Sequence, residues 1–198
     1  MRKVFLLLSA LLLMFHSRVK AQQIEGIEIY GGYSYLQDNL SSTFSPFYSP
    51  FTPFGADFSL NGWQASITEK ATDWLGLVQE FAGYYGTKNL LGADNRFDTF
   101  SVLSGPRFYY PGLKVITPFV HALFGYDNTS VTIKPQNFKA TSGSYAMAFG
   151  GGVDVDASRT LAIRLFQFDY YRPQSFGTGQ NNWRVSAGLV FRFGGRRR

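Results

Sequence analysis

The C-terminal stretch NWRVSAGLVFRF, residues 182–193, decides the fold. The odd-numbered positions of this stretch are Trp183, Val185, Ala187, Leu189, Phe191 and Phe193. The even-numbered positions include Asn182, Arg184, Ser186, Gly188 and Arg192. This period of two is typical of an extended strand with one apolar and one polar face. A tilted strand needs roughly 9–11 residues to cross a bilayer, and this stretch is long enough. We therefore predict a membrane-spanning strand whose odd-numbered residues face lipid.

The composition of the whole chain agrees with a barrel of such strands. Its 198 residues suffice for one domain, with 18% aromatic and 16% charged residues and 21 glycines, which is unusual for a soluble globular domain. Outside the N-terminus no run of 18 apolar residues occurs, so any membrane span must be a strand in a closed sheet. The absence of cysteine excludes disulfides and thiolate metal sites.

Residues 1–21 have a basic start, a short apolar core and a small residue at Ala21, which predicts a cleaved signal peptide rather than a retained anchor. The leader holds four cations: Arg2, Lys3, Arg18 and Lys20. Subtracting them from the net charge of +6 leaves +2, and the three terminal arginines exceed that. No basic face for nucleic acid is therefore expected. The predicted organisation is a signal peptide (1–21), a barrel (22–193) and a basic tail (194–198).

The mature chain contains seven further candidate strands with the same alternation: residues 25–36, 59–69, 74–86, 98–110, 115–126, 144–155 and 161–172. In the last of these the parity slips, and a bulge near Leu165 would turn Gln167 and Asp169 inward. The connections at 70–73, 111–114 and 156–160 are short; those at 37–58, 87–97, 127–143 and 173–181 are long. This alternation is typical of outer-membrane barrels with both termini in the periplasm.

Charged strand residues lie opposite the apolar face. We predict a lumenal charge network of Glu80, Arg107, His121, Asp154, Arg164, Asp169 and Arg184. Glu80, Arg107, Asp154 and Arg164 are expected to form a plug of ion pairs, with Arg184 near Asp154 and Asp169. Glu28 and Arg192, near strand ends, are expected to be individually solvated. An eight-stranded lumen is filled by side chains, so a general diffusion pore is not expected.

The parity alone also allows the inverse arrangement, a soluble lipocalin-like barrel with its apolar face inside. An Arg on the lipid face costs about 2–4 kcal/mol, and the mixed charges could pair inside a lumen. The inward parity is also rich in glycine and alanine, which leaves room for long side chains. We therefore favour the polar-in barrel.

The segment 37–58 is an outlier, because it combines prolines with aromatic residues. The aromatic residues proposed for this external loop are Phe44, Phe47, Tyr48, Phe51 and Phe54. Its prolines prohibit a regular ladder. The loop either binds a surface partner or packs its aromatics on the barrel rim.

No catalytic, cofactor-binding or metal site is predicted. His121 is the one imidazole expected after cleavage, and it lacks the His-x-Ser spacing associated with eight-stranded lipid A deacylases. A single His is too few ligands for a metal site. The glycines at 150–152 do not follow a strand and open a helix, as a phosphate loop would.

Ser186, Gly188, Phe191 and Phe193 resemble the C-terminal assembly signal of bacterial outer-membrane barrels. Together with phrases such as EIYGGYSYL (28–36), TPFVHALFG (117–125) and LAIRLFQFDYY (161–171), the chain resembles the small outer-membrane β-barrel family related to the OmpA transmembrane domain. The resemblance implies an all-β, eight-stranded antiparallel up-and-down transmembrane barrel in a Gram-negative outer membrane. The implied partners are outer-membrane lipid, lipopolysaccharide and the barrel assembly machinery. No C-terminal peptidoglycan-binding domain follows Phe193, so wall anchoring is not carried over.

These observations predict a structural or surface-interaction protein with a plugged lumen and no enzymatic activity. A small-solute channel, a lipid-modifying enzyme and a soluble periplasmic binding barrel remain as alternatives. The extracellular ligand is not identified by the sequence.

Overall fold

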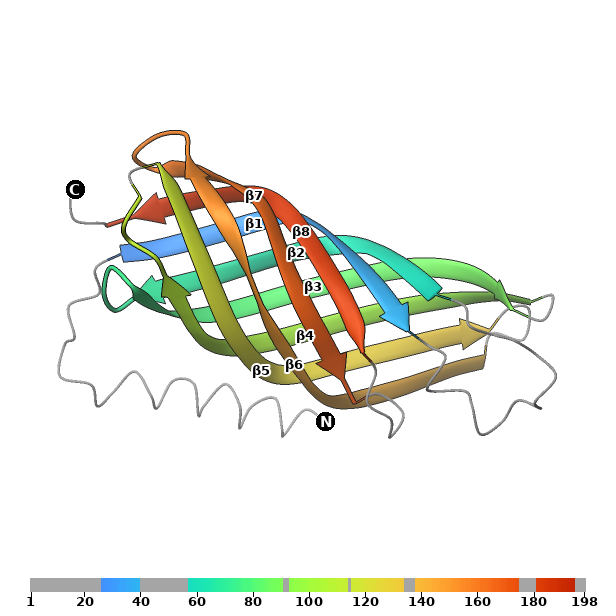
Figure 1. The fold of residues 1–198 in the computed structure, drawn as a ribbon. Coiled ribbons are helices and arrows are strands. Elements are labelled where there is room, and N and C mark those ends of the chain that lie inside the picture. The colour runs from blue at the N-terminus through green and yellow to red at the C-terminus, as the bar shows by residue number, and fades with distance from the viewer. Residues whose placement is uncertain are drawn as a thin grey trace.

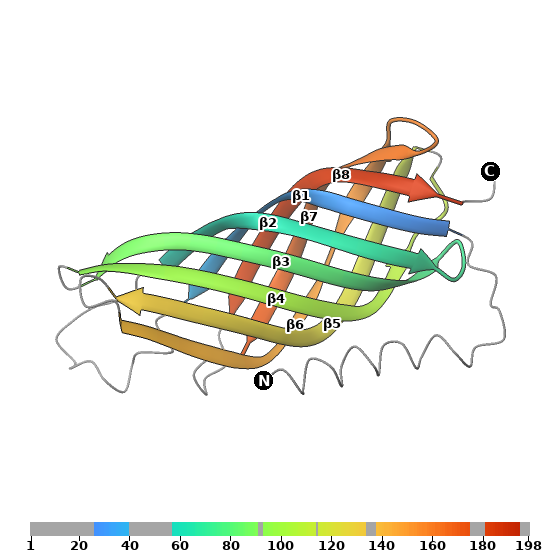
Figure 2. The ribbon, with the colours of Figure 1, turned by 180° about the vertical axis from the view of Figure 1, so that it is seen from behind.

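The computed structural model describes residues 26–39, 57–90, 93–113, 115–133, 138–174 and 181–194. They form eight antiparallel strands in sequence order, and β1 pairs with β8 to close the barrel (Figures 1 and 2). The strands are β1 Gly26–Asn39, β2 Asp57–Lys70, β3 Leu75–Leu90, β4 Ala93–Tyr109, β5 Ile116–Ile133, β6 Phe138–Asp156, β7 Leu161–Pro173 and β8 Asn182–Phe193. The predicted fold class is confirmed. The signal peptide, the aromatic loop residues and the terminal arginines lie outside the described residues.

The two ends of the barrel differ. We call one end of the barrel the turn end. There the chain passes from strand to strand at residues 71–74, 110–115 and 157–160, and there β1 begins and β8 ends. Two of these turns share one hydrogen-bond pattern: Thr72 and Ser158 each donate a backbone N–H to the carbonyl of a leucine three residues later, Leu75 or Leu161, at 3.1 and 2.9 Å. Their hydroxyls accept the backbone N–H of the same leucines at 3.0 and 3.1 Å. Side-chain oxygens thus satisfy polar backbone groups at the turn.

At the opposite end, the loop end, strands β3 to β6 continue further than the predicted ranges. β3 pairs with β4 up to Leu90 opposite Ala93, and β5 with β6 up to Ile133 opposite Phe138. The prediction of long loops at 87–97 and 127–143 is therefore wrong. Figure 1 shows this four-stranded extension projecting past β7 and β8. Its outward residues, such as Asn128 and Lys139, are polar and exposed, so the apolar alternation that marked the strands ends before the ladder does.

The bulge predicted near Leu165 is confirmed. The register shifts between Arg164 and Gln167 in the β7–β8 pair, and between Val153 and Asp154 in the β6–β7 pair. Leu165 and Phe166 both face outward, 56% and 49% exposed, while Arg164 and Gln167 are buried. Two consecutive outward residues restore the inward parity of the rest of β7.

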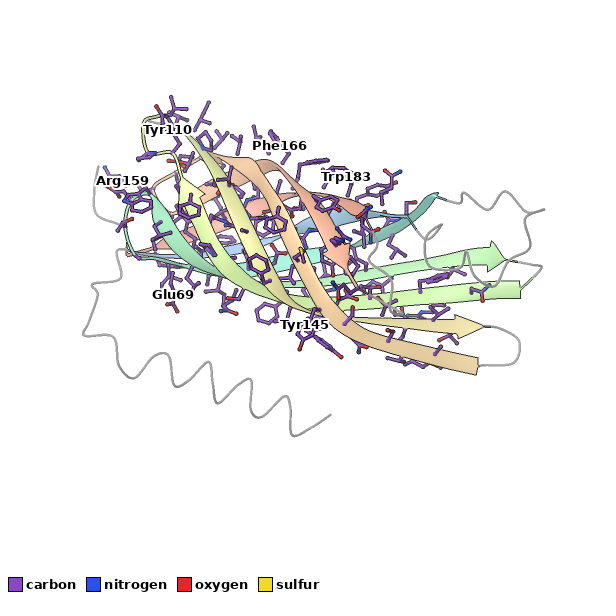
Figure 3. The ribbon with its side chains drawn as sticks, turned by 60° about the horizontal axis from the view of Figure 1, so that its bottom comes forward. Glu69, Tyr110, Tyr145, Arg159, Phe166 and Trp183 are labelled. Carbon is purple, nitrogen blue, oxygen red and sulfur yellow. The ribbon has the colours of Figure 1, made fainter. Side chains whose placement is uncertain are left out.

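Apolar side chains cover the outside of the barrel as a belt. At its loop-end edge lie Tyr33, Tyr35, Trp63, Tyr85, Tyr126, Tyr145, Tyr170 and Trp183; at its turn-end edge lie Trp74, Phe108, Tyr110 and Phe193. Figure 3 shows Tyr145, Phe166 and Trp183 pointing away from the barrel. Aromatic girdles at both edges of an apolar band are the signature of a barrel in lipid. Among the described residues, no helix is long and apolar enough to cross a membrane.

Candidate functional site

The seven side chains of the predicted charge network all point into the lumen. They come from six strands: Glu80 on β3, Arg107 on β4, His121 on β5, Asp154 on β6, Arg164 and Asp169 on β7, and Arg184 on β8. Each is at most 4% exposed. Together with Gln64 and Gln167 they form what we call the lumenal cluster. Buried charges require partners, so the pairing within this cluster decides what it does.

Asp169 is the hub of the lumenal cluster. Its Oδ2 accepts hydrogen bonds from Arg184 Nε at 2.9 Å, Arg184 Nη2 at 2.6 Å and Gln167 Nε2 at 2.8 Å. Its Oδ1 lies 2.8 Å from His121 Nε2. Arg184 Nη2 also lies 2.6 Å from Glu80 Oε1, so one guanidinium joins two carboxylates. The hub therefore ties β3, β5, β7 and β8 together across the lumen.

Arg164 makes a second, separate ion pair. Its Nε and Nη2 bond both carboxylate oxygens of Asp154 at 2.7 and 3.1 Å, a bidentate geometry that combines charge with direction. The guanidinium also lies 4.3 Å from the centre of the Tyr30 ring and 4.4 Å from that of Phe119. Arg107 lies 4.4 Å from the same Phe119 ring. The ring thus stabilises two cations by cation–π contact.

Arg107 has no carboxylate partner among the described residues. Its Nη1 lies 3.4 Å from Thr68 Oγ1 and its Nη2 lies 3.5 Å from His121 Nδ1. Because arginine can only donate, this contact favours a neutral His121 with its hydrogen on Nε2, where it donates to Asp169. His121 then connects Arg107 to Asp169. With a neutral ring, three arginines balance Glu80, Asp154 and Asp169.

The predicted pairing within the cluster was partly wrong. Glu80 does not pair with Arg107, because the β3–β4 register places Glu80 opposite Leu103 and Arg107 opposite Gly76. That offset of four residues is about 13 Å along a strand. Arg184 contacts Asp169 as expected, and Asp154 pairs with Arg164, another member of the predicted plug, rather than with Arg184.

An apolar cluster fills much of the lumen beside these charges. It contains Leu36, Leu60, Val78, Ala82, Tyr84, Phe97, Leu103, Leu123, Ala146, Ala148 and Tyr171. Along β5 it begins at Leu123, one inward position beyond His121 toward the loop end. Sequence reasoning missed this layer and the inward Tyr30 and Phe119. The available signal was that these residues occupy the alternate positions of their strands, opposite to the aromatic residues that face lipid.

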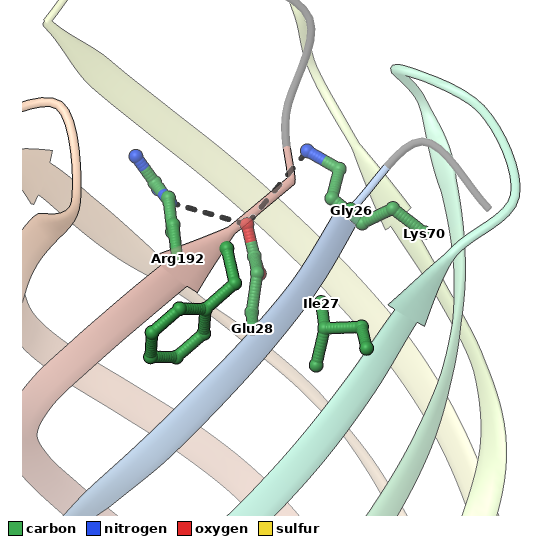
Figure 4. Close-up of a pocket in the computed structure, with 6 residues that line it drawn as sticks. Gly26, Ile27, Glu28, Lys70 and Arg192 are labelled. Carbon is green, nitrogen blue, oxygen red and sulfur yellow. Dashed lines mark hydrogen bonds and ion pairs between the residues drawn. The ribbon is translucent and has the colours of Figure 1, made fainter.

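Glu28 and Arg192 form a further cluster at the turn end, so the expectation that each is individually solvated was wrong. Glu28 is 2% exposed and accepts hydrogen bonds from Tyr109 Oη at 2.7 Å and Arg192 Nε at 3.1 Å. Lys70 Nζ lies 3.7 Å from Glu28 Oε1, and Arg192 also bonds Asp156. Figure 4 shows Lys70 and Arg192 reaching the Glu28 carboxylate from either side. The recess that these residues line has a volume of about 70 Å³. These contacts join β1, β2, β4, β6 and β8 at the barrel mouth.

The predicted assembly-signal residues lie along the seam between β8 and β1. Ser186 and Gly188 face inward, and Phe191 and Phe193 face outward, 45% and 54% exposed. Gly188 is paired with Gly32 of β1. A Cβ on Gly188 would lie 2.3 Å from the Gly31 carbonyl oxygen, so the close approach at the seam requires glycine there.

Searches by sequence and by structure gave different results. No protein-family model matches the chain, and no curated protein matches it. Neisserial surface protein A has 12% identity and a TM-score of 0.66, covering 84% of this chain and 97% of that one. OprG, an outer membrane protein of Pseudomonas aeruginosa, has 16% identity and a TM-score of 0.52, covering 85% and 96%. The chain has the fold of small outer-membrane β-barrels.

A third match to this outer-membrane barrel fold is Ail, the attachment invasion locus protein of Yersinia pestis. It was crystallised with the heparin analogue sucrose octasulfate. The identity is 16%, the TM-score 0.56, and the coverage 84% of this chain and 99% of that one. The resemblance predicted from the sequence is confirmed at the level of the fold.

Proposed function

We propose that the protein is an integral outer-membrane barrel whose role is structural or in surface interaction. The observation that carries the proposal is its inverted polarity: charged side chains are buried in the lumen while an apolar, aromatic-edged belt faces outward. A soluble binding barrel would place the apolar face inside. Lipid is the solvent that makes the observed arrangement favourable, since outward arginine would cost about 2–4 kcal/mol at mid-membrane.

The turn end faces the periplasm in this proposal and the loop end faces outward. Short periplasmic turns and a larger external side are the usual asymmetry of such barrels. The extension of β3 to β6 beyond the aromatic edge then forms an external platform with polar outward residues. This platform is the surface available to a partner.

Lipopolysaccharide phosphates are the ligands that the outward cations at the loop end would take. Arg172 lies two residues past Tyr170 on the outward parity of β7 and is exposed, at the level where headgroups begin. Arg96 and Lys139 face outward further along β4 and β6. The complex of Ail with sucrose octasulfate is a precedent for polyanion binding on this fold.

The lumen is closed in this proposal, and His121 has a positioning role rather than a catalytic one. The lumenal cluster and the apolar cluster fill the interior, and His121 is 4% exposed with both ring nitrogens directed at Asp169 and Arg107. A general base needs access to substrate, which this position does not provide. Steady conductance in planar bilayers, or lipid A modification lost in His121→Ala, would contradict this part.

Fractionation and detergent-gel mobility test the membrane assignment. We expect recovery with outer membranes and a heat-dependent shift in mobility; recovery as a freely soluble periplasmic protein would overturn it. For the ligand, Arg172→Gln should reduce retention on vesicles containing lipopolysaccharide. Lys70→Gln, at the turn end, is the matched control and should leave retention unchanged.

A further inference from the structure

Two polar side chains interrupt the lipid-facing belt near its middle. Gln79 on β3 lies between the belt edges at Trp74 and Tyr85, and Ser104 on β4 lies midway between the outward Phe100 and Phe108. The two are direct cross-strand partners, and Gln79 Nε2 donates to Ser104 Oγ at 2.8 Å. The other described outward residues at this depth are apolar, aromatic or glycine.

This hydrogen bond satisfies only part of the Gln79 amide. The Oε1 acceptor and the second N–H have no partner among the described residues. In hydrocarbon no water is available to them, so they favour a polar partner from another molecule. Two fully buried glutamines, Gln64 and Gln167, face the lumen and bond carboxylates there. Gln79 is therefore placed differently from the glutamines that serve the lumenal cluster.

The shared direction in which copies of the barrel insert favours a second copy as the partner of Gln79. Copies of one barrel insert in the same direction, so a two-fold axis between them runs along the membrane normal and brings equal depths together. A residue near that axis then meets its own copy. A glutamine amide is complementary to itself, since each can donate an N–H to the Oε1 of the other. An ionised side chain in this place would meet a like charge.

The residues around Gln79 and Ser104 differ in size. Ala65, Val102 and Ala122 are small, outward, half-buried and diagonal to the pair, whereas Ile67 and Phe124, directly opposite Gln79 and Ser104, are 45% and 52% exposed. Small residues at a membrane interface let two surfaces come close enough for polar side chains to bond. We propose that the protein self-associates in the membrane through the β3–β4 face, with the Gln79 amides of two copies hydrogen-bonded across the axis.

Thiol crosslinking in reconstituted vesicles tests this interface, because the chain has no cysteine. Leu77→Cys places a thiol beside Gln79, and Ile163→Cys on β7, four strands away and 43% exposed, is the matched control. With a short bis-maleimide at high lipid dilution, we expect at least fivefold more dimer from Leu77→Cys. Adding Gln79→Leu should lower its yield to the control level, whereas adding Ser104→Ala, which frees the amide, should not lower it.

Each other outcome overturns the proposal. Equal yields from the two thiols would show random collision, and a yield unaffected by Gln79→Leu would show that the amide is not the contact. A Leu77→Cys adduct in native membranes with a mass other than twice the chain would identify a different partner. Heat-dependent gel mobility of every variant confirms that each is folded, so loss of crosslinking cannot arise from misfolding.

Discussion

Replacing Asp169 by Asn should destabilise the barrel more than any other single isosteric change in the lumenal cluster. Asp169 Oδ2 receives three donors, and its Oδ1 receives the His121 Nε2 donor. An amide has only one acceptor oxygen, so in either orientation its NH₂ group faces at least one donor. Arg184 also loses one of its two carboxylates and keeps Glu80. Breaking a buried pair in this way costs about 3–5 kcal/mol.

The assay is equilibrium unfolding in urea, in detergent or short-chain lipid, followed by tryptophan fluorescence. Trp63, Trp74 and Trp183 face outward, so unfolding moves all three tryptophans from lipid to water. Asp98→Asn is the control, because Asp98 pairs with Arg96 at 3.0 Å on the exposed outer face. That change should cost at most about 1 kcal/mol.

The double variant Asp169→Asn with Arg184→Met separates charge pairing from packing. Removing both partners eliminates the Asp169–Arg184 pair but leaves Glu80 without its cation, so only part of the lost stability should return. The reasoning is refuted if Asp169→Asn costs no more than Asp98→Asn. It is also refuted if the double variant is as unstable as the sum of the two single changes, because no coupling would then exist.

Three further changes test the seam, the assembly signal and the bulge. Gly188→Ala should destabilise the barrel or prevent its closure, since its Cβ would meet the Gly31 backbone, whereas Gly31→Ala, with nothing within 4 Å, should be tolerated in the same urea assay. Phe191→Ser with Phe193→Ser should abolish accumulation in the outer membrane; full yield there would contradict the assembly-signal assignment. Leu165→Arg should cost about 2–4 kcal/mol in the same assay if that bulge residue faces lipid, and a neutral effect would contradict the outward placement.

The face of each side chain could be predicted from the sequence, because a strand alternates sides with a period of two. Parity alone placed Arg107, Asp154 and Arg184 inward. The bulge at Leu165 could also be predicted, since a membrane strand whose apolar parity changes partway needs one extra residue to keep its apolar face toward lipid. The extent of β3 to β6 could not, because outside the membrane either face of a strand can be polar.

Apart from the contact between Arg184 and Asp169, the partners of the charges could not be predicted, because parity gives the face but not the height along the barrel. The register supplies the height. Asp154 is directly opposite Arg164, Asp169 opposite Arg184, and Glu28 opposite Arg192, and all three pairs bond. Glu80 and Arg107, two members of the predicted plug of ion pairs, do not pair with each other because they are four residues out of register. Cross-strand neighbours are thus the pairs to test first once a register is known.

Charge pairing alone would not seal the lumen. A mobile ion can replace one partner of an ion pair, or it can follow water between polar side chains. The apolar cluster around Leu103, Leu123 and Tyr84 adds a different barrier, since an ion crossing it must lose its hydration without a polar partner. The two clusters lie side by side in the lumen, since Leu103 is directly opposite Glu80 and Leu36 is directly opposite Arg184. The folded Asp169→Asn variant loses only the charge pairing and keeps the apolar cluster. It should therefore show no steady conductance in planar bilayers. If the lumen is closed as proposed, the loop-end platform and the lipid-facing belt remain as surfaces for contact with other molecules.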